Sequence, residues 1–184
     1  MKRTRILGLS AAIAFLAASP LHAQTTPPKQ TTGSAPTSQA SRTDQHFLTE
    51  AIQADLAEVQ IGKLAQQKGD NDQVKQYGQM LEQDHGQHLQ QAQQIASQIG
   101  VTAPTEPSAA QKATYDKLNK LSGASFDKQF ALAMVRDHKE DVAKFQKMAK
   151  EKSPVGDLAG KTVPVLQKHL QSAEALTSAK SAKR

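Results

Sequence analysis

The sequence predicts an all-α fold, a bundle of four long helices. Apolar residues recur at intervals of three and four along most of the chain after residue 43, which is the period of an amphipathic helix. Proline and glycine fall mostly between these periodic segments, and the β-branched runs typical of strands are absent. A repeat supports the same interpretation. Residues 76–96 align without gaps on residues 129–149 and share an Asp-His pair, at Asp84-His85 and Asp137-His138.

The first 23 residues have the layout of a secretory signal peptide. Basic residues at positions 2, 3 and 5 precede an uncharged run over residues 6–18, and Ala23 ends a cleavage site with a small residue. The uncharged run is shorter than the roughly 20 residues that a spanning helix needs. We therefore expect an exported protein with no transmembrane segment after signal removal, in the periplasm of a Gram-negative bacterium. The alternative is an uncleaved N-terminal anchor.

Composition divides the rest of the chain into a linker, a domain and a tail. Residues 24–43 are mostly Thr, Pro, Ser and Gln. Such a segment has too little apolar surface to offset the entropy lost on ordering, which predicts a disordered linker. Residues 44–178 have the length of one domain, the predicted bundle. Residues 179–184 form a basic C-terminal tail.

Charge and cysteine content narrow the functional classes. The formal net charge is +6, but the predicted signal peptide holds three of the 23 basic residues and none of the 17 acidic ones, which leaves +3. There is no basic stripe, and aromatic residues make up only 4% of the chain, so we expect no nucleic-acid partner. Because the chain has no cysteine, packing, with or without a metal ion, must stabilise the fold.

The first two long helices form a hairpin. One is expected over residues 44–68, ending at Gly69, and the next over residues 70–99. Asp70 and Gln73 have the spacing of a capping box at the start of the second helix. The turn is short, so the two helices should be antiparallel neighbours.

A second hairpin follows after a long connection. Its helices are expected at about residues 126–152 and 157–177, and Pro164 should kink the last helix or delay its start. The connection, residues 100–124, carries a short helix over residues 109–121. A connection of this length can run along the whole bundle and leave the second and third long helices parallel. That is the ferritin-like arrangement.

Each long helix places one ionisable residue at the centre of its apolar face. With a rotation of 100° per residue, apolar side chains lie within about 40° of each of these four residues. They are Glu58, His85, His138 and His169. All are near mid-helix, so we expect them to meet at a similar depth. Buried charges and unpaired imidazoles are costly, so the four must satisfy one another, bind water or bind a cation. Three imidazoles and a carboxylate can complete a four-coordinate transition-metal site.

Four further residues are expected around this site. His88 and Asp141 lie about 60° from the centres of their helix faces, where they either add ligands and hydrogen bonds or simply line the edge of the apolar face. Asp84 and Asp137 point sideways toward a neighbouring helix. A carboxylate in that position orients an imidazole or forms an interhelical ion pair.

The residues of three segments resemble a known bacterial family. These are AEVQIGKLAQQKGDNDQVKQYGQMLEQDH (residues 57–85), SGASFDKQFALAMVRDH (122–138) and VPVLQKHL (163–170), and they are similar to the family called domain of unknown function 4142. Its members are often labelled outer-membrane or exported proteins and are assigned a ferritin-like four-helix fold. The resemblance implies that fold and export, and it implies no activity. Outer-membrane association rests on that label alone. The family motif positions include Glu58, Asp84, His85, Asp137, His138 and His169.

Enzymatic activity has little support in the sequence. Di-iron proteins of the ferritin-like type carry a Glu-x-x-His pair on each of two helices. Here Glu82 precedes His85 with that spacing, but no acidic residue stands three positions before His169. A Ser-His-Asp order, a phosphate-binding glycine loop and a cysteine nucleophile are also absent. A non-enzymatic role fits the sequence better.

Two functions therefore remain open. In the first, an exported bundle binds one transition-metal ion, of a kind that the sequence does not name, for metal binding or stress protection in the cell envelope. In the second, the buried residues form a metal-free polar network in a structural or interaction module of the envelope. The glutamine-rich face of residues 76–98, or the long connection, would then contact a protein partner. The sequence carries no signal for an oligomeric state.

Overall fold

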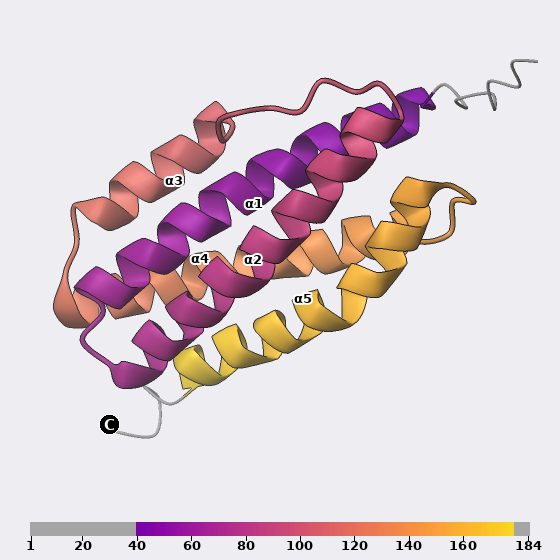
Figure 1. Ribbon diagram of the computed structural model, residues 1–184. Helices are drawn as coiled ribbons and strands as arrows, with labels where there is room; N and C mark the ends of the chain where they lie inside the picture. The colour runs from indigo at the N-terminus through magenta and orange to yellow at the C-terminus, as the bar shows by residue number, and fades with distance from the viewer. Residues whose placement is uncertain (1–39, 179–184) are drawn as a thin grey trace, which may run out of the picture. The chain divides into compact units, whose positions relative to one another are not determined.

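The computed structural model describes residues 40–178, and within this range every regular element is an α-helix. The helices are α1 (Arg42–Lys68), α2 (Asp72–Gln98), α3 (Ala109–Asn119), α4 (Gly123–Met148) and α5 (Pro154–Ser178) (Figure 1). The predicted all-α class is thus confirmed. The predicted signal peptide, most of the linker and the basic tail lie outside the described residues. None of the described helices is both long enough and apolar enough to cross a membrane.

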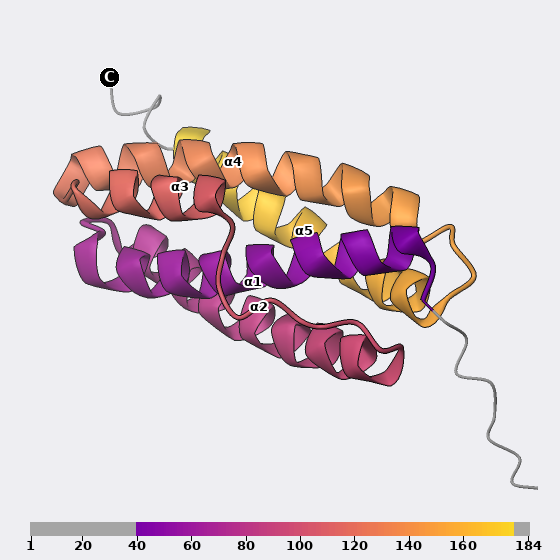
Figure 2. The same cartoon turned by 90° about the horizontal axis from the view of Figure 1, so that it is seen from above.

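Two helical hairpins pack together as a four-helix bundle. α1 packs along α2 and α4 along α5, while contacts of α2 with α5 and of α1 with α4 close the bundle. The connection after α2 returns along the bundle before α3, so α2 and α4 run in the same direction (Figures 1 and 2). α3 lies outside the bundle against α1 and α4. The predicted ferritin-like bundle with a long crossover and a short extra helix is confirmed.

Local capping moves the first two helix starts away from the predicted positions. α1 begins at Arg42, two residues before the predicted domain start, because the Ser41 side chain caps it by accepting the backbone N–H of Asp44. The predicted capping box at the start of α2 is wrong. Asn71 is the N-cap instead, and its side-chain oxygen accepts the backbone N–H of Gln73.

The later boundaries also differ from the prediction. α5 begins at Pro154 and contains Pro164, so of the two expected effects of Pro164, a kink or a late start, the late start is wrong. Proline suits the first position of a helix, where its missing N–H would have no helical partner. α4 ends at Met148, four residues before the predicted end, and a short turn leads from it into α5.

Close packing of α1 on α2 depends on two glycines that face each other. A Cβ atom on Gly62 would lie 2.6 Å from the carbonyl oxygen of Gly78, and one on Gly78 would lie 2.6 Å from the carbonyl oxygen of Gly62. The turn between the helices is held by the buried carboxylate of Asp127 on α4, which accepts the backbone N–H groups of Asp70 and Asn71. These contacts place the α1 and α2 side chains in a defined register.

The core consists of two apolar clusters with polar side chains between them. One cluster gathers Leu48, Ile52, Ala92 and Phe145 at one end of the bundle. The other gathers Leu64, Leu81, Phe126, Phe130 and Met134 toward the other end. The buried polar residues Asp55, Glu58, His85, His88, His138 and His169 occupy helix positions between these two groups. The apolar core is thus interrupted at mid-bundle by ionisable side chains.

Candidate metal centre

Three histidines from three different helices meet in the middle of the bundle. His85 on α2, His138 on α4 and His169 on α5 each offer a ring nitrogen, and these three nitrogens lie within 4.8 Å of one another. The residues are 5%, 0% and 1% exposed. The structure therefore brings together the three histidines that the sequence predicted to converge, and we refer to them as the histidine cluster.

The other ring nitrogen of each imidazole in the cluster donates a hydrogen bond to an oxygen atom outside the cluster. Nδ1 of His85 donates to the carboxylate of Asp55 at 2.9 Å. Nδ1 of His138 donates to the carbonyl oxygen of Met134, one turn earlier on α4, at 2.9 Å. Nε2 of His169 donates to the carboxylate of Asp84 at 2.8 Å. Metal-binding histidines typically have such a partner, which fixes the tautomer and turns the free nitrogen toward the ion.

These outer hydrogen bonds leave two lone pairs facing each other. Nε2 of His138 and Nδ1 of His169 lie 3.3 Å apart. Since the opposite nitrogen of each ring carries the hydrogen, neither facing nitrogen has one to donate while the rings are neutral. A cation shared between the two nitrogens would satisfy both.

Glu58 on α1 lies beside the cluster. Its Oε2 atom is 3.9 Å from Nε2 of His85, and neither atom makes a hydrogen bond within residues 40–178. Glu58 is only 4% exposed, so this oxygen is not satisfied by bulk water. Buried polar atoms without partners are uncommon, and an ion that bridges them is one explanation. The donor set of three imidazoles and one carboxylate fits a four-coordinate transition-metal ion.

Burial keeps two of the imidazoles neutral. It lowers the pKa of His138 to about 3, with a further contribution from the charges of His85 and His169. Burial also lowers the pKa of His169 to about 4, and the nearby charge of His85 acts in the same direction. A metal ion needs the neutral imidazole, so both side chains are in the binding form at neutral pH.

The pKa values of His85 and Glu58 are raised, unlike those of His138 and His169. Burial alone would lower the pKa of His85, but the hydrogen bond to Asp55 and the charge of Glu58 raise it to about 9. Burial raises the pKa of Glu58 to about 8, although the charge of His85 opposes this. The charge of each group favours the charged form of the other, and a bound metal ion would displace the protons that the pair holds.

Asp55 is the residue that the sequence analysis missed. Its carboxylate accepts from Nδ1 of His85 and also from Nδ1 of His88, at 2.7 Å, so it joins two imidazoles of α2 to α1. Burial would raise the pKa of Asp55, but these two hydrogen bonds lower it overall. A signal was present, because Asp55 is about 60° around its helix from Glu58, the same offset that separates His88 from His85.

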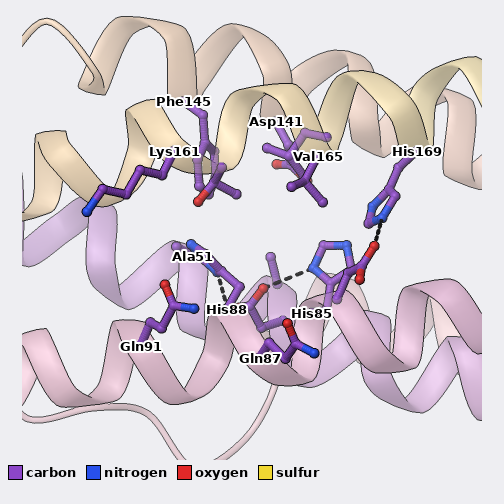
Figure 3. A pocket seen from close by; sticks show the side chains of 15 residues that line it. Ala51, His85, Gln87, His88, Gln91, Asp141, Phe145, Lys161, Val165 and His169 are labelled. Atoms are coloured by element: carbon purple, nitrogen blue, oxygen red, sulfur yellow. Dashed lines mark hydrogen bonds and ion pairs between the residues drawn. The ribbon is translucent and has the colours of Figure 1, made fainter.

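The other predicted residues have different surroundings. Asp84 orients an imidazole, as expected. His88 joins the network through Asp55, and Asp141 lines a cavity of about 210 Å³ together with His85, His88 and His169 (Figure 3). The expectation for Asp137 is wrong. Its carboxylate pairs with Arg136, the preceding residue of α4, and within residues 40–178 it pairs with neither an imidazole nor another helix.

Comparisons with known proteins agree with the fold. No curated protein matches the chain. A solved structure, described as the crystal structure of a DUF305 fragment from Deinococcus radiodurans, is similar with a TM-score of 0.68. The identity is 16%, and the match covers 76% of this chain and 97% of that chain, so it shows a shared fold alone. The family described as domain of unknown function (DUF4142) has a sequence model that matches residues 29–176. The chain therefore belongs to the DUF4142 family.

Proposed function

We propose that this chain is an exported protein of the cell envelope that binds one transition-metal ion. The histidine cluster would supply three ligands and Glu58 the fourth. The observation that carries this proposal is the pair of imidazole nitrogens of His138 and His169, 3.3 Å apart, whose outer nitrogens both donate elsewhere. A metal ion bound between these two nitrogens would satisfy both lone pairs.

The donor set indicates the kind of ion. Neutral imidazoles with one carboxylate suit Zn²⁺, Co²⁺, Ni²⁺ and Cu²⁺, whereas Mg²⁺ and Ca²⁺ require oxygen ligands. The positive charge of the ion would interact favourably with the imidazole lone pairs and the Glu58 carboxylate, which all face the centre of the site. Because all four side chains are buried, the role that fits best is retention of a metal ion, for metal binding or protection against stress in the envelope.

Metal analysis of the purified protein tests the proposal. Protein prepared from the periplasm without chelators should contain close to one ion per chain, and its melting temperature should fall after chelation and recover on adding the ion. His138→Gln should abolish this recovery, while His46→Gln, a change at an exposed histidine of α1, should not. Substoichiometric metal, together with no thermal shift on adding zinc, copper, cobalt, nickel, iron or manganese, would overturn it.

A metal-free role has one observation in its favour. The carboxylate of Asp55 satisfies His85 and His88 without any ion, as expected of a polar network that specifies helix register. The protein would then be a structural or interaction module of the envelope. The double variant His85→Leu and His138→Leu separates the two functions. Both functions predict a less stable apo protein, because Asp55 loses His85 as a partner. Only a metal protein also loses a metal-dependent thermal shift that the wild type has.

A further inference from the structure

A groove lined by carboxylates leads from the protein surface to Glu58. It lies between α1 and α4, and residues of α3 line part of it. The cavity has a volume of about 480 Å³. Four of its acidic residues, Glu58, Asp137, Glu140 and Asp141, define what we call the acidic groove.

The acidic residues of α4 become more buried toward the metal centre. Glu140 is exposed, Asp137 and Asp141 are partly buried, and Glu58 on the opposite wall is 4% exposed. On α4, Asp137 is three positions before Glu140 and four positions before Asp141. Its side chain therefore lies beside both of the others on the helix surface. The carboxylates of α4 therefore line the groove from its exposed side, and the candidate ligand Glu58 lines the same groove from α1.

The charges of the groove favour a cation. Its lining includes two basic residues, and both are paired with acidic residues: Arg136 with Asp137 and Lys144 with Glu50. Burial raises the pKa of Asp141 to about 6, and the negative charges of Asp137 and Asp55 add to the shift. A divalent cation in the groove would relieve this repulsion.

An independent observation ties the groove to a ligand. Oε2 of Glu58 is buried and has no hydrogen-bond partner in the described part of the chain, and Glu58 lines the groove while its Oε2 lies 3.9 Å from Nε2 of His85. The second cavity that reaches the cluster is lined by His85 and His169 and by the carboxylates of Asp55, Asp84 and Asp141 (Figure 3). Asp55 and Asp84 already accept hydrogen bonds from imidazoles, and the exposed Lys161 in the same lining opposes the approach of a cation.

We propose that the acidic groove is an outer docking site for a hydrated divalent cation and the path by which the ion reaches Glu58 and the histidine cluster. This inference rests on the proposed metal-binding function. Asp137 and Glu140 would attract and hold the hydrated ion by charge, and Glu58 would be the first inner ligand that it meets. Carboxylates suit that step, because they bind cations that still keep water ligands.

Loading kinetics of the full chain test the inference. Apo protein is mixed with Co²⁺ at low ionic strength, and the visible absorption of bound Co²⁺ is followed by stopped flow. The double variant Asp137→Asn and Glu140→Gln should load about tenfold more slowly than wild type, with a weaker dependence on salt, because the groove has lost its attraction for the ion. Its equilibrium affinity should stay within about threefold of wild type, since the inner ligands are intact.

A matched variant controls for net charge. Asp116→Asn with Glu151→Gln removes two exposed acidic side chains that do not line the groove, and it should load at the wild-type rate. The inference is overturned if the groove variant loads as fast as this control while binding Co²⁺ normally. It is also overturned if Lys161→Glu accelerates loading while the groove variant loads at the wild-type rate, since the ion then enters through the other cavity. A wild-type chain that binds no Co²⁺ would instead refute the proposed function itself.

Discussion

The carboxylate of Asp84 on α2 accepts a hydrogen bond from Nε2 of His169 on α5, over 2.8 Å. This contact fixes the tautomer of His169 and turns its Nδ1 atom toward Nε2 of His138. It also links two helices that belong to different hairpins. Asp84 therefore prepares a ligand without belonging to the ligand set.

Replacing Asp84 with Asn should weaken metal binding about 10- to 100-fold, because the amide no longer fixes the His169 tautomer. Competition titration against a chromophoric chelator measures the change. Asp137→Asn is the matched control, since Asp137 occupies the equivalent position of the sequence repeat but pairs with Arg136. Equal equilibrium affinities for the two variants would contradict an orienting role for Asp84.

Replacing Asp55 with Asn should destabilise the apo protein by about 3 kcal/mol, because a buried charge partner of two imidazoles is lost. The amide has one acceptor oxygen, so it cannot accept from both His85 and His88 in the present arrangement. Urea unfolding in the presence of a chelator gives the change in the free energy of unfolding. Asp116→Asn, on the exposed face of α3, should change it by less than about 0.5 kcal/mol. A similarly small effect of Asp55→Asn would show that the hydrogen bonds from His85 and His88 to Asp55 contribute nothing to the free energy of unfolding.

The apo protein should lose stability as pH rises from about 6.5 to 9. The folded-state pKa of Glu58 is raised from 4.5 to about 8, and that of His85 from 6.5 to about 9, so the folded state holds more protons than the unfolded state in this range. Their contribution is complete below the unfolded pKa values and is lost as pH passes through the folded ones. His138 and His169 stay neutral throughout the range, because their pKa values are lowered.

Unfolding by urea at several pH values between 6.5 and 9 measures this loss. Glu58→Gln should reduce the slope, since the amide does not titrate. Saturating metal should reverse the slope, because the ion takes the place of the protons on Glu58 and His85. Apo stability that rises with pH over this range would refute the assignment of these two protons.

Two glycine substitutions should have opposite effects on stability. Gly62→Ala should destabilise the protein by about 2 kcal/mol or more, because its Cβ would lie 2.6 Å from the Gly78 carbonyl oxygen and force α1 away from α2. Gly86→Ala is the control. It lies inside α2, and the nearest atom to its Cβ would be 4.0 Å away, so the better helix propensity of alanine should add about 0.5–1 kcal/mol. Thermal unfolding measures both, and a neutral Gly62→Ala would show that the two helices can separate at no cost.

Much of the candidate site could be predicted because the helix period is a local property. A rotation of 100° per residue already decides that Glu58, His85, His138 and His169 lie on the apolar faces of their helices, and all four are buried. The long connection between two short hairpins similarly indicated parallel second and third long helices. Boundaries were less accurate, because single capping side chains such as Ser41 and Asn71 set them.

The partners of these side chains were decided only by the tertiary structure. Asp84 and Asp137 occupy the same place in the repeat, yet one meets an imidazole of α5 and the other pairs with its neighbour Arg136. Asp55 on α1 reaches two imidazoles of α2, and the two helices approach closely at Gly62 and Gly78. The sequence by itself determined that Glu58 and the three histidines point inward. The distances and register between helices decided which atoms they meet, because a hydrogen bond depends on tenths of an ångström between chain segments far apart in sequence.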